Sequence, residues 1–188
     1  MAPVRETMNA AAIDRFGGPD VLSLHELPIP TVAAGEVLIA VHTAGVGSWD
    51  ADGRGGWYPA GRPRFPLVLG TDGSGIVVRV GAGVRRFRAG DRVLAYRFEN
   101  PKGGFYAEYV ALPARNVARI PRGLDLVHAG AMTVTGLTAL QGIDDALHLE
   151  PGETIGILGA SGGVGTLAVQ FAKLRRARVL AIASGRGG

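Results

Sequence analysis

Hydrophobic and polar positions alternate over short stretches between residues 8 and 120, which is the pattern of strands with one buried face. The alternation predicts strands at residues 8–14, 21–27, 36–43, 67–80 (one bent strand) and 92–96, with two more in 104–120 that break at Pro113. Gly and Pro residues separate these closely spaced strands, so we expect an antiparallel barrel or sandwich. Residues 44–61 are polar, aromatic and glycine-rich, which predicts a surface loop or short helix of the kind that carries function.

The pattern changes at Leu124, because residues 125–149 lose the alternation and predict one or two helices with Asp125 as N-cap. A short apolar run at 154–158 follows, then a glycine-rich loop at 159–165, and a second apolar run at 179–183. Between the loop and the second run, apolar residues recur at a helical spacing of three and four: Val164, Leu167, Ala168, Phe171 and Ala172. The segment therefore predicts a strand–turn–helix–strand unit with a right-handed crossover.

The loop at 159–165 suits a diphosphate group. Ala160, Gly162 and Gly165 occupy the three glycine positions of a G-x-G-x-x-G pattern, with alanine in place of the first. Small residues there allow a tight turn, a close approach of the phosphates to the backbone and close helix–strand packing. The first N–H groups of the helix add donors and the positive end of its dipole. A glycine-rich turn without a ligand is the alternative, but the position between strand and helix favours a dinucleotide site.

The residues after the second run indicate which dinucleotide binds. An NAD site needs an acidic residue about 20 positions beyond the glycines, and no Asp or Glu follows Glu153. Ser184 and Arg186 follow the run instead, and an arginine can bind the extra phosphate of NADP by charge-assisted hydrogen bonds. The alternative for Arg186 is a solvated side chain in a frayed terminus. We favour NADP(H).

Composition narrows the class of protein. The 188-residue chain is 47% hydrophobic and 19% charged, which predicts a folded protein with a substantial core. Its pI of about 10 comes from dispersed arginines, so nucleic-acid binding is not expected. The chain has no cysteine, which excludes disulfides and thiolate metal sites. No signal-like segment and no apolar run of 18 residues is seen, so we expect no membrane association and a cytoplasmic location.

Seven motifs give the chain a resemblance to a known family. They are RFGGPDVL (15–22), GEVLIAVHTAGV (35–46), GTDGSGIVVRVG (70–81), FRAGDRV (87–93), GGFYAEY (103–109), TGLTA (135–139) and GASGGVG (159–165). In this order they resemble the medium-chain dehydrogenase/reductase superfamily, within it the zinc-lacking quinone oxidoreductases that include the zeta-crystallin-like reductases. The resemblance implies an all-β plus α/β chain. Residues 1–123 are then a GroES-like antiparallel barrel domain for catalysis and substrate, and 124–188 a helical linker with the first βαβ unit of a Rossmann NADP-binding domain.

The resemblance also bears on metal chemistry. The zinc-dependent branch of the superfamily has a Cys after Gly-Val and a His-Glu after a glycine, where this chain has Gly47, Thr71 and Asp72. The cysteines of a structural zinc site are absent as well. A tetrahedral zinc needs Cys, His or carboxylate ligands, and the four histidines have no ligand spacing. We therefore expect no zinc and no other metal.

The resemblance assigns candidate site residues. The reductase branch usually carries Asn-x-x-Asp, then Arg and Tyr, and this chain has Gly47, Ser48, Trp49 and Asp50, then Arg54 and Tyr58. Catalytic roles fall to Ser48, Asp50 and Tyr58. Cofactor contacts fall to Trp49, Thr135, Thr138, Ala160, Gly162, Gly163, Val164, Gly165, Ser184 and Arg186. Simpler alternatives remain open: Trp49 and Tyr58 cap the barrel, Asp50 pairs with Arg54 along a helix, and the two threonines cap or pack.

The implied reaction is hydride transfer from NADPH to a small quinone or α,β-unsaturated carbonyl. A complete dinucleotide fold has two βαβαβ halves, and this chain holds one βαβ unit. We therefore expect the N-terminal portion of a longer, homodimeric reductase that is inert or nearly so by itself. Two alternatives stay open: an enoyl-thioester reductase, and a non-catalytic binding or interaction module.

Overall fold

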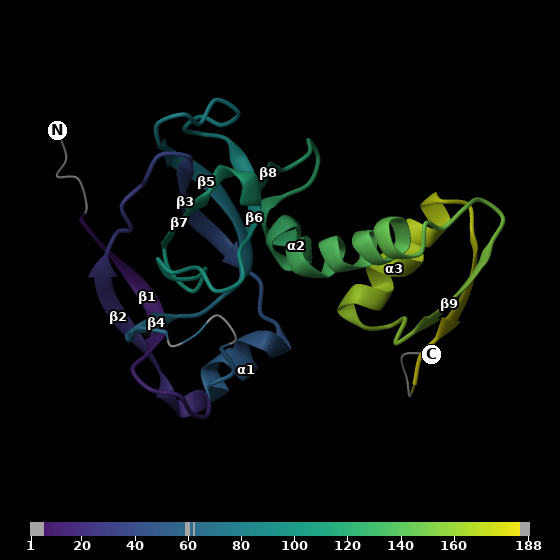
Figure 1. Ribbon diagram of the computed structural model, residues 1–188, viewed down its shortest axis with the longest axis horizontal. Helices are drawn as coiled ribbons and strands as arrows, with labels where there is room; N and C mark the ends of the chain where they lie inside the picture. The colour runs from purple at the N-terminus through teal and green to yellow at the C-terminus, as the bar shows by residue number, and fades with distance from the viewer. Residues whose placement is uncertain (1–5, 59–60, 62, 185–188) are drawn as a thin grey trace. The chain divides into compact units, whose positions relative to one another are not determined.

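The computed structural model describes residues 6–58, 61 and 63–184. The chain divides into two compact units, Met1–Thr133 and Val134–Gly188. In Figure 1 the first unit contains the purple to teal strands and the second contains the yellow-green helix and strands. The division falls inside a helix, whereas the domain boundary expected after residue 123 stays a prediction.

The first unit is antiparallel. The described residues of this unit form strands β1 (Thr7–Ile13), β2 (Leu22–Pro28), β3 (Glu36–Ala44), β4 (Leu67–Val68), β5 (Asp72–Val80), β6 (Arg92–Tyr96), β7 (Tyr109–Pro113) and β8 (Val117–Arg119). They form a three-stranded sheet of order β2-β1-β4 and a five-stranded sheet of order β7-β3-β5-β6-β8. Short 3-10 turns occupy Pro19–Val21 and Ala114–Asn116. Helix α1 (Ser48–Gly55) follows β3 and lies at the lower end of this unit in Figure 1.

One strand expectation was wrong. Residues 67–80 form two strands in different sheets rather than one bent strand, because the chain turns at Gly70. Gly70 has φ +93°, and a Cβ built on it would lie 2.9 Å from the backbone nitrogens of Phe105 and Tyr106. Only glycine fits both the backbone angle and the close approach.

The core of the first unit follows from the period of two along its strands. Alternate residues of β3, β5, β6 and β7 point inward around Phe105, which is 1% exposed. The two sheets are joined where Tyr106 and Glu108 meet β1: the Ala11 N–H donates to the Tyr106 carbonyl and the Glu108 N–H to the Asn9 carbonyl. This junction fixes the position of the loop before β7.

Helix α2 (Leu126–Gln141) continues into a π-helical turn at Gly142–Ala146. The expected N-cap is confirmed, since the His128 N–H donates to Oδ1 of Asp125 at 2.8 Å. The stretch Leu126–Ala146, with mean hydropathy 1.2, is long and apolar enough to cross a membrane by length and composition alone. Core helices of folded proteins pass the same test, and a single such helix is weak evidence for a membrane.

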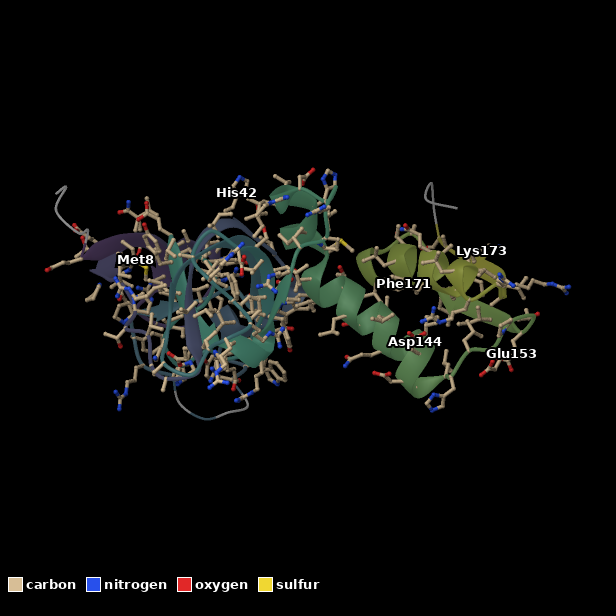
Figure 2. All side chains as sticks on the ribbon, turned by 90° about the horizontal axis from the view of Figure 1, so that it is seen from above. Met8, His42, Asp144, Glu153, Phe171 and Lys173 are labelled. Carbon is tan, nitrogen blue, oxygen red and sulfur yellow. The ribbon has the colours of Figure 1, made fainter. Side chains whose placement is uncertain are left out.

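The second unit contains the expected βαβ arrangement: β9 (Thr154–Leu158), α3 (Gly163–Leu174) and β10 (Arg178–Ile182), with β9 and β10 parallel. Ala172 of α3 is buried with Ile143, Ile157 and Ala177, and Phe171, labelled in Figure 2, packs against this cluster. The predicted apolar face of α3 is confirmed except at its start, where Val164 is 38% exposed. The all-β region followed by a βαβ unit is the fold class that the sequence indicates.

Candidate functional site

The glycine-rich loop lies between the carboxyl end of β9 and the first turn of α3. Gly159 makes the turn with φ +68°, and the Ala160 N–H donates to the Ile182 carbonyl at the end of β10. The Gly162 N–H donates to the Gly159 carbonyl at 2.9 Å, and Gly162 is the N-cap of α3. The loop is therefore tied to both strands, which holds the start of the helix in place.

Space requires glycine at position 165 of the loop, and Gly163 lies close to a neighbouring side chain. A Cβ on Gly165 would lie 2.1 Å from the Gly159 carbonyl oxygen, so glycine is needed for the helix to pack against the loop. A Cβ on Gly163 would lie 3.3 Å from the Thr135 methyl group, so Thr135 stands beside the loop. The third role, the tight turn, is carried by Gly159 and not by position 160, because Gly159 has the left-handed backbone angle.

The start of α3 offers donors for an anion. The Thr166 N–H bonds the Gly162 carbonyl, while the N–H groups of Gly163, Val164 and Gly165 precede the first intrahelical bond. The N-cap residue, Gly162, has no side chain that could occupy these donors. Next to the loop an open cavity of about 620 Å³ is lined by Ala160 and Ser161, by three residues along α3 and by residues 181–183 at the end of β10. A phosphate on the loop would have this hollow beside it.

The remaining cofactor candidates in the second unit are Thr138, Ser184 and Arg186. Ser184 is exposed two positions beyond the end of β10. Thr138 is exposed on α2, one helical turn beyond the half-buried Thr135. Arg186 lies outside the described residues. The structure therefore brings Thr135 to the loop, and the adenosine-side roles of Ser184 and Arg186 stay predictions.

The second group of candidates lies on α1, in the first unit. Asp50 is 6% exposed, and its carboxylate accepts the Gly47 N–H at 2.8 Å, the Tyr106 hydroxyl and the Gly70 N–H. Burial raises the pKa of Asp50 above the usual aspartate value, and the three hydrogen bonds oppose that rise. The same burial, with the negative charge of Asp50, raises the pKa of Tyr106. Asp50 thus holds the start of α1 against the loops that carry Gly70 and Tyr106.

Trp49 contacts two residues of the same region. Its indole N–H donates to the hydroxyl of Thr71 at 2.7 Å, and Thr71 is buried. Its ring lies on Gly47, since a Cβ at position 47 would fall 2.2 Å from ring atoms Cε2 and Cζ2. The indole therefore fills the volume that any side chain at position 47 would occupy.

The two hydroxyl candidates differ in exposure. Ser48 is exposed at the first position of α1. Tyr58 is half-buried and packs against Ile13, Val21, Leu67 and Leu69. Burial, and then the negative charge of Glu99, raise the pKa of Tyr58 above the usual tyrosine value. Tyr58 is consequently a protonated hydroxyl, and a possible hydrogen-bond donor, over the whole neutral range.

Sequence reasoning missed Tyr106 and the contact between Trp49 and Gly47. The GGFYAEY motif contains Tyr106, but nothing in the motif points to Asp50. The proposed pairing of Asp50 with Arg54 is replaced by other bonds, as the Arg54 Nε donates to the Gly17 carbonyl at 3.2 Å.

At the positions of zinc ligands in other branches, Thr71 and Asp72 are buried. Among the residues that the structure describes, no group of three or more His, Asp and Glu is suited to a metal ion.

Comparison with known proteins agrees with this geometry. Residues 33–122 match the model of the alcohol dehydrogenase GroES-like domain. Quinone oxidoreductase of Pongo abelii is 33% identical over 189 aligned residues, which cover all of this chain and 56% of the relative. The solved quinone oxidoreductase of Coxiella burnetii superimposes with a TM-score of 0.85 at 32% identity, covering 96% of this chain and 57% of that one. The Escherichia coli quinone oxidoreductase solved with NADPH gives 0.83 at 29% identity, covering 95% and 54%.

The chain thus spans about half the length of the relatives it matches, as 56% and 57% show. The agreement extends over the antiparallel unit and the βαβ unit together, since the alignment to the Pongo abelii protein covers the whole chain. The chain therefore contains an alcohol dehydrogenase GroES-like domain and is, over its whole length, a homologue of quinone oxidoreductases of the medium-chain dehydrogenase/reductase superfamily.

Proposed function

We propose that the chain is the substrate domain and the first cofactor-binding unit of an NADPH-dependent reductase that transfers hydride to a quinone or an α,β-unsaturated carbonyl. The observation that carries this proposal is the glycine loop between β9 and α3, where three helix-start N–H groups precede the first intrahelical bond and the loop residues Ala160 and Ser161 line a cavity of about 620 Å³. Gly165 supports it further, because a Cβ at this position would fall 2.1 Å from the Gly159 carbonyl oxygen, so glycine lets α3 pack closely against the loop, as the dinucleotide pattern requires.

The preference for NADP(H) over NAD(H) rests on charge. The segment after β10 offers Ser184 and Arg186 and no acidic residue, so an additional phosphate there meets donors and no repulsion. The cavity beside the loop reaches Ala183, the residue before Ser184. The E. coli relative was solved in complex with NADPH, which supports the same choice.

The test compares NADPH with NADH on the 188-residue chain. Calorimetric titration of Arg186→Ala is expected to show NADPH binding weakened roughly 10- to 100-fold, since a hydrogen bond to a charged group contributes ~1.5–3 kcal/mol, and unchanged NADH binding. Arg178→Ala is the matched control, because Arg178 is an exposed arginine at the opposite end of β10. Equal affinity of the chain for both dinucleotides would remove the NADP preference.

In the reaction the cofactor supplies the hydride, and the protein orients the acceptor and excludes water. Negative charge develops on the acceptor oxygen, so a hydroxyl directed at it lowers the barrier. Tyr58 and Ser48 are the proposed donors. The bonds of Asp50 to Gly47, Gly70 and Tyr106 assign it a positioning role for α1 rather than contact with the acceptor. In a complete reductase with this sequence, turnover of 1,4-naphthoquinone that is unchanged in Tyr58→Phe and Ser48→Ala would eliminate both hydroxyls.

We also propose that the chain alone turns over very slowly or not at all and uses no zinc. The side of the β9–β10 sheet away from the core exposes Leu158 (79%), Leu180 (57%) and Ile182 (51%), and a dinucleotide fold binds its ligand across two halves. The exposed face also favours the second candidate, a non-catalytic module whose sheet a partner covers. NADPH that leaves the melting temperature of the chain unchanged would support that module. An enoyl-thioester acceptor, a homodimeric parent and a cytoplasmic location stay predictions.

A further inference from the structure

The contact between Trp49 and Gly47 determines the character of a slot in the first unit. The slot is lined by Trp49, Trp57, Tyr58, Leu67, Leu69 and Phe98, among others. Both tryptophans of the chain take part. Trp57 and Phe98 stack at a tilt, with ring centroids 5.9 Å apart. The slot is therefore walled by rings and branched aliphatic side chains on several sides.

The polar atom of the indole already has a hydrogen-bond partner in the wall of the slot, because Thr71 also lines it. The Trp49 N–H is used by Thr71 at 2.7 Å, so what Trp49 presents to the slot is hydrocarbon. A side chain at position 47 would collide with that ring at 2.2 Å, so the wall exists because residue 47 is glycine. Gly47 and Trp49 therefore act as a pair.

The size and charge of the slot restrict what it accepts. Its volume of about 40 Å³ is little more than the ~30 Å³ share of one water, so only the edge of a bound molecule can enter it. In the described part of the chain, the charged side chains that line it are carboxylates, Asp50 and Glu99. An anionic group is repelled from such a low-dielectric site.

On the basis of the proposed reductase function, we propose that Trp49, seated on Gly47, is a specificity-determining residue whose ring makes the slot accept the edge of a flat, uncharged aromatic electron acceptor. A quinone or thioester that carries an anionic substituent near the reacting ring is disfavoured.

Tryptophan fluorescence tests this directly, because both tryptophans line the slot. Trp57→Phe leaves Trp49 as the single reporter. This variant is titrated with 1,4-naphthoquinone and with its 2-sulfonate, which has the same rings and one negative charge. The chain has no cysteine, so addition of the quinone to thiols does not interfere. We expect saturable quenching by the neutral quinone and roughly tenfold weaker binding of the sulfonate.

Three further variants distinguish a Trp49 ring that contacts the bound quinone from one that only stabilises the fold. Glu99→Gln should strengthen binding of the sulfonate and leave the neutral quinone unchanged, which a packing defect does not do. Trp49→Val, with Trp57 as reporter, should weaken naphthoquinone binding by about tenfold. Trp49→Phe in the same assay should keep most of the affinity for naphthoquinone. It replaces Trp49→Val as the test if the valine variant does not fold.

Linear quenching without saturation, equal affinity for both probes, or unchanged affinity in Trp49→Val would overturn the inference. NADPH binding measured on the same samples separates this inference from the proposed function. If NADPH binds and the slot binds the neutral quinone and the sulfonate equally, only the proposed role of Trp49 is wrong. If the slot discriminates and NADPH does not bind, the cofactor proposal fails and the binding site remains.

Discussion

Replacing Gly47 by alanine tests the packing on which the Trp49 wall depends. The backbone of Gly47 has φ −119° and ψ 166°, an extended conformation that alanine adopts freely, so any cost comes from space alone. The new Cβ would lie 2.2 Å from two ring atoms, whereas carbon atoms in contact stay about 3.5–4.0 Å apart. The indole must therefore move by more than an ångström.

The cost has two parts. Overpacking typically costs ~1–3 kcal/mol. A moved indole also loses its 2.7 Å hydrogen bond to Thr71, which contributes a net ~1 kcal/mol. We expect a loss of about 2–4 kcal/mol, or a fall of roughly 10 °C in the melting temperature of the first unit.

A double-mutant cycle isolates the contact. In a Trp49→Val background the ring is gone, so Gly47→Ala should cost less than about 0.5 kcal/mol, as at an ordinary surface site. The matched control is Gly55→Ala at the end of the same helix, where an added Cβ meets nothing within 4 Å and alanine should stabilise the helix slightly. Urea unfolding followed by circular dichroism measures all four stabilities. An equal cost of Gly47→Ala in both backgrounds would falsify the contact.

Two more predictions concern the other features described above. Gly165→Ala should abolish NADPH binding in calorimetry and lower the stability of the second unit by about 3 kcal/mol, because its Cβ would lie 2.1 Å from the Gly159 oxygen. Gly156→Ala on β9, which meets nothing within 4 Å, should leave binding intact. For Glu36, burial opposes ionisation, but the bonds from Lys102 and the Ala33 N–H outweigh it and hold its pKa below the usual glutamate value. This stability is present above the unfolded-state pKa and is lost as pH falls through the folded-state value. Melting curves of wild type and Lys102→Met should therefore differ at pH 7 and converge in acid.

Periodicity was enough to predict most of the fold. Strand β9 was expected at residues 154–158 and occupies Thr154–Leu158, and β6 was expected at 92–96 and occupies Arg92–Tyr96. These runs are bounded by turn residues, so their limits are local properties of the sequence. The wrong prediction at 67–80 has a cause that is not local to the sequence. The turn at Gly70 is required by the neighbouring backbone of Phe105 and Tyr106, which lies far along the chain.

The site likewise has features that the local sequence predicts and contacts that depend on distant parts of the chain. The loop at 159–165 was located from its own glycines, and Gly165 has the packing role that the pattern predicts. Asp50 was noticed, but the donors that hold it, Gly70 and Tyr106, come from two distant loops. Trp49 was placed among the cofactor contacts by position alone. Its partner Thr71 could not be inferred, because the hydrogen bond depends on how α1 is set against the turn before β5.

Position 47 differs from the residue that is usual in the reductase branch, and the effect of this difference depends on the neighbouring Trp49. The reductase branch usually carries asparagine there, and the structure shows that glycine at 47 and tryptophan at 49 occupy one volume between them. Gly47→Asn alone should therefore be more destabilising than Gly47→Ala, since a larger side chain meets the same ring at 2.2 Å. Gly47→Asn together with Trp49→Val should recover most of the lost stability in urea unfolding. If the asparagine variant is as stable as wild type while Trp49 is present, the two positions vary independently and the paired wall does not exist.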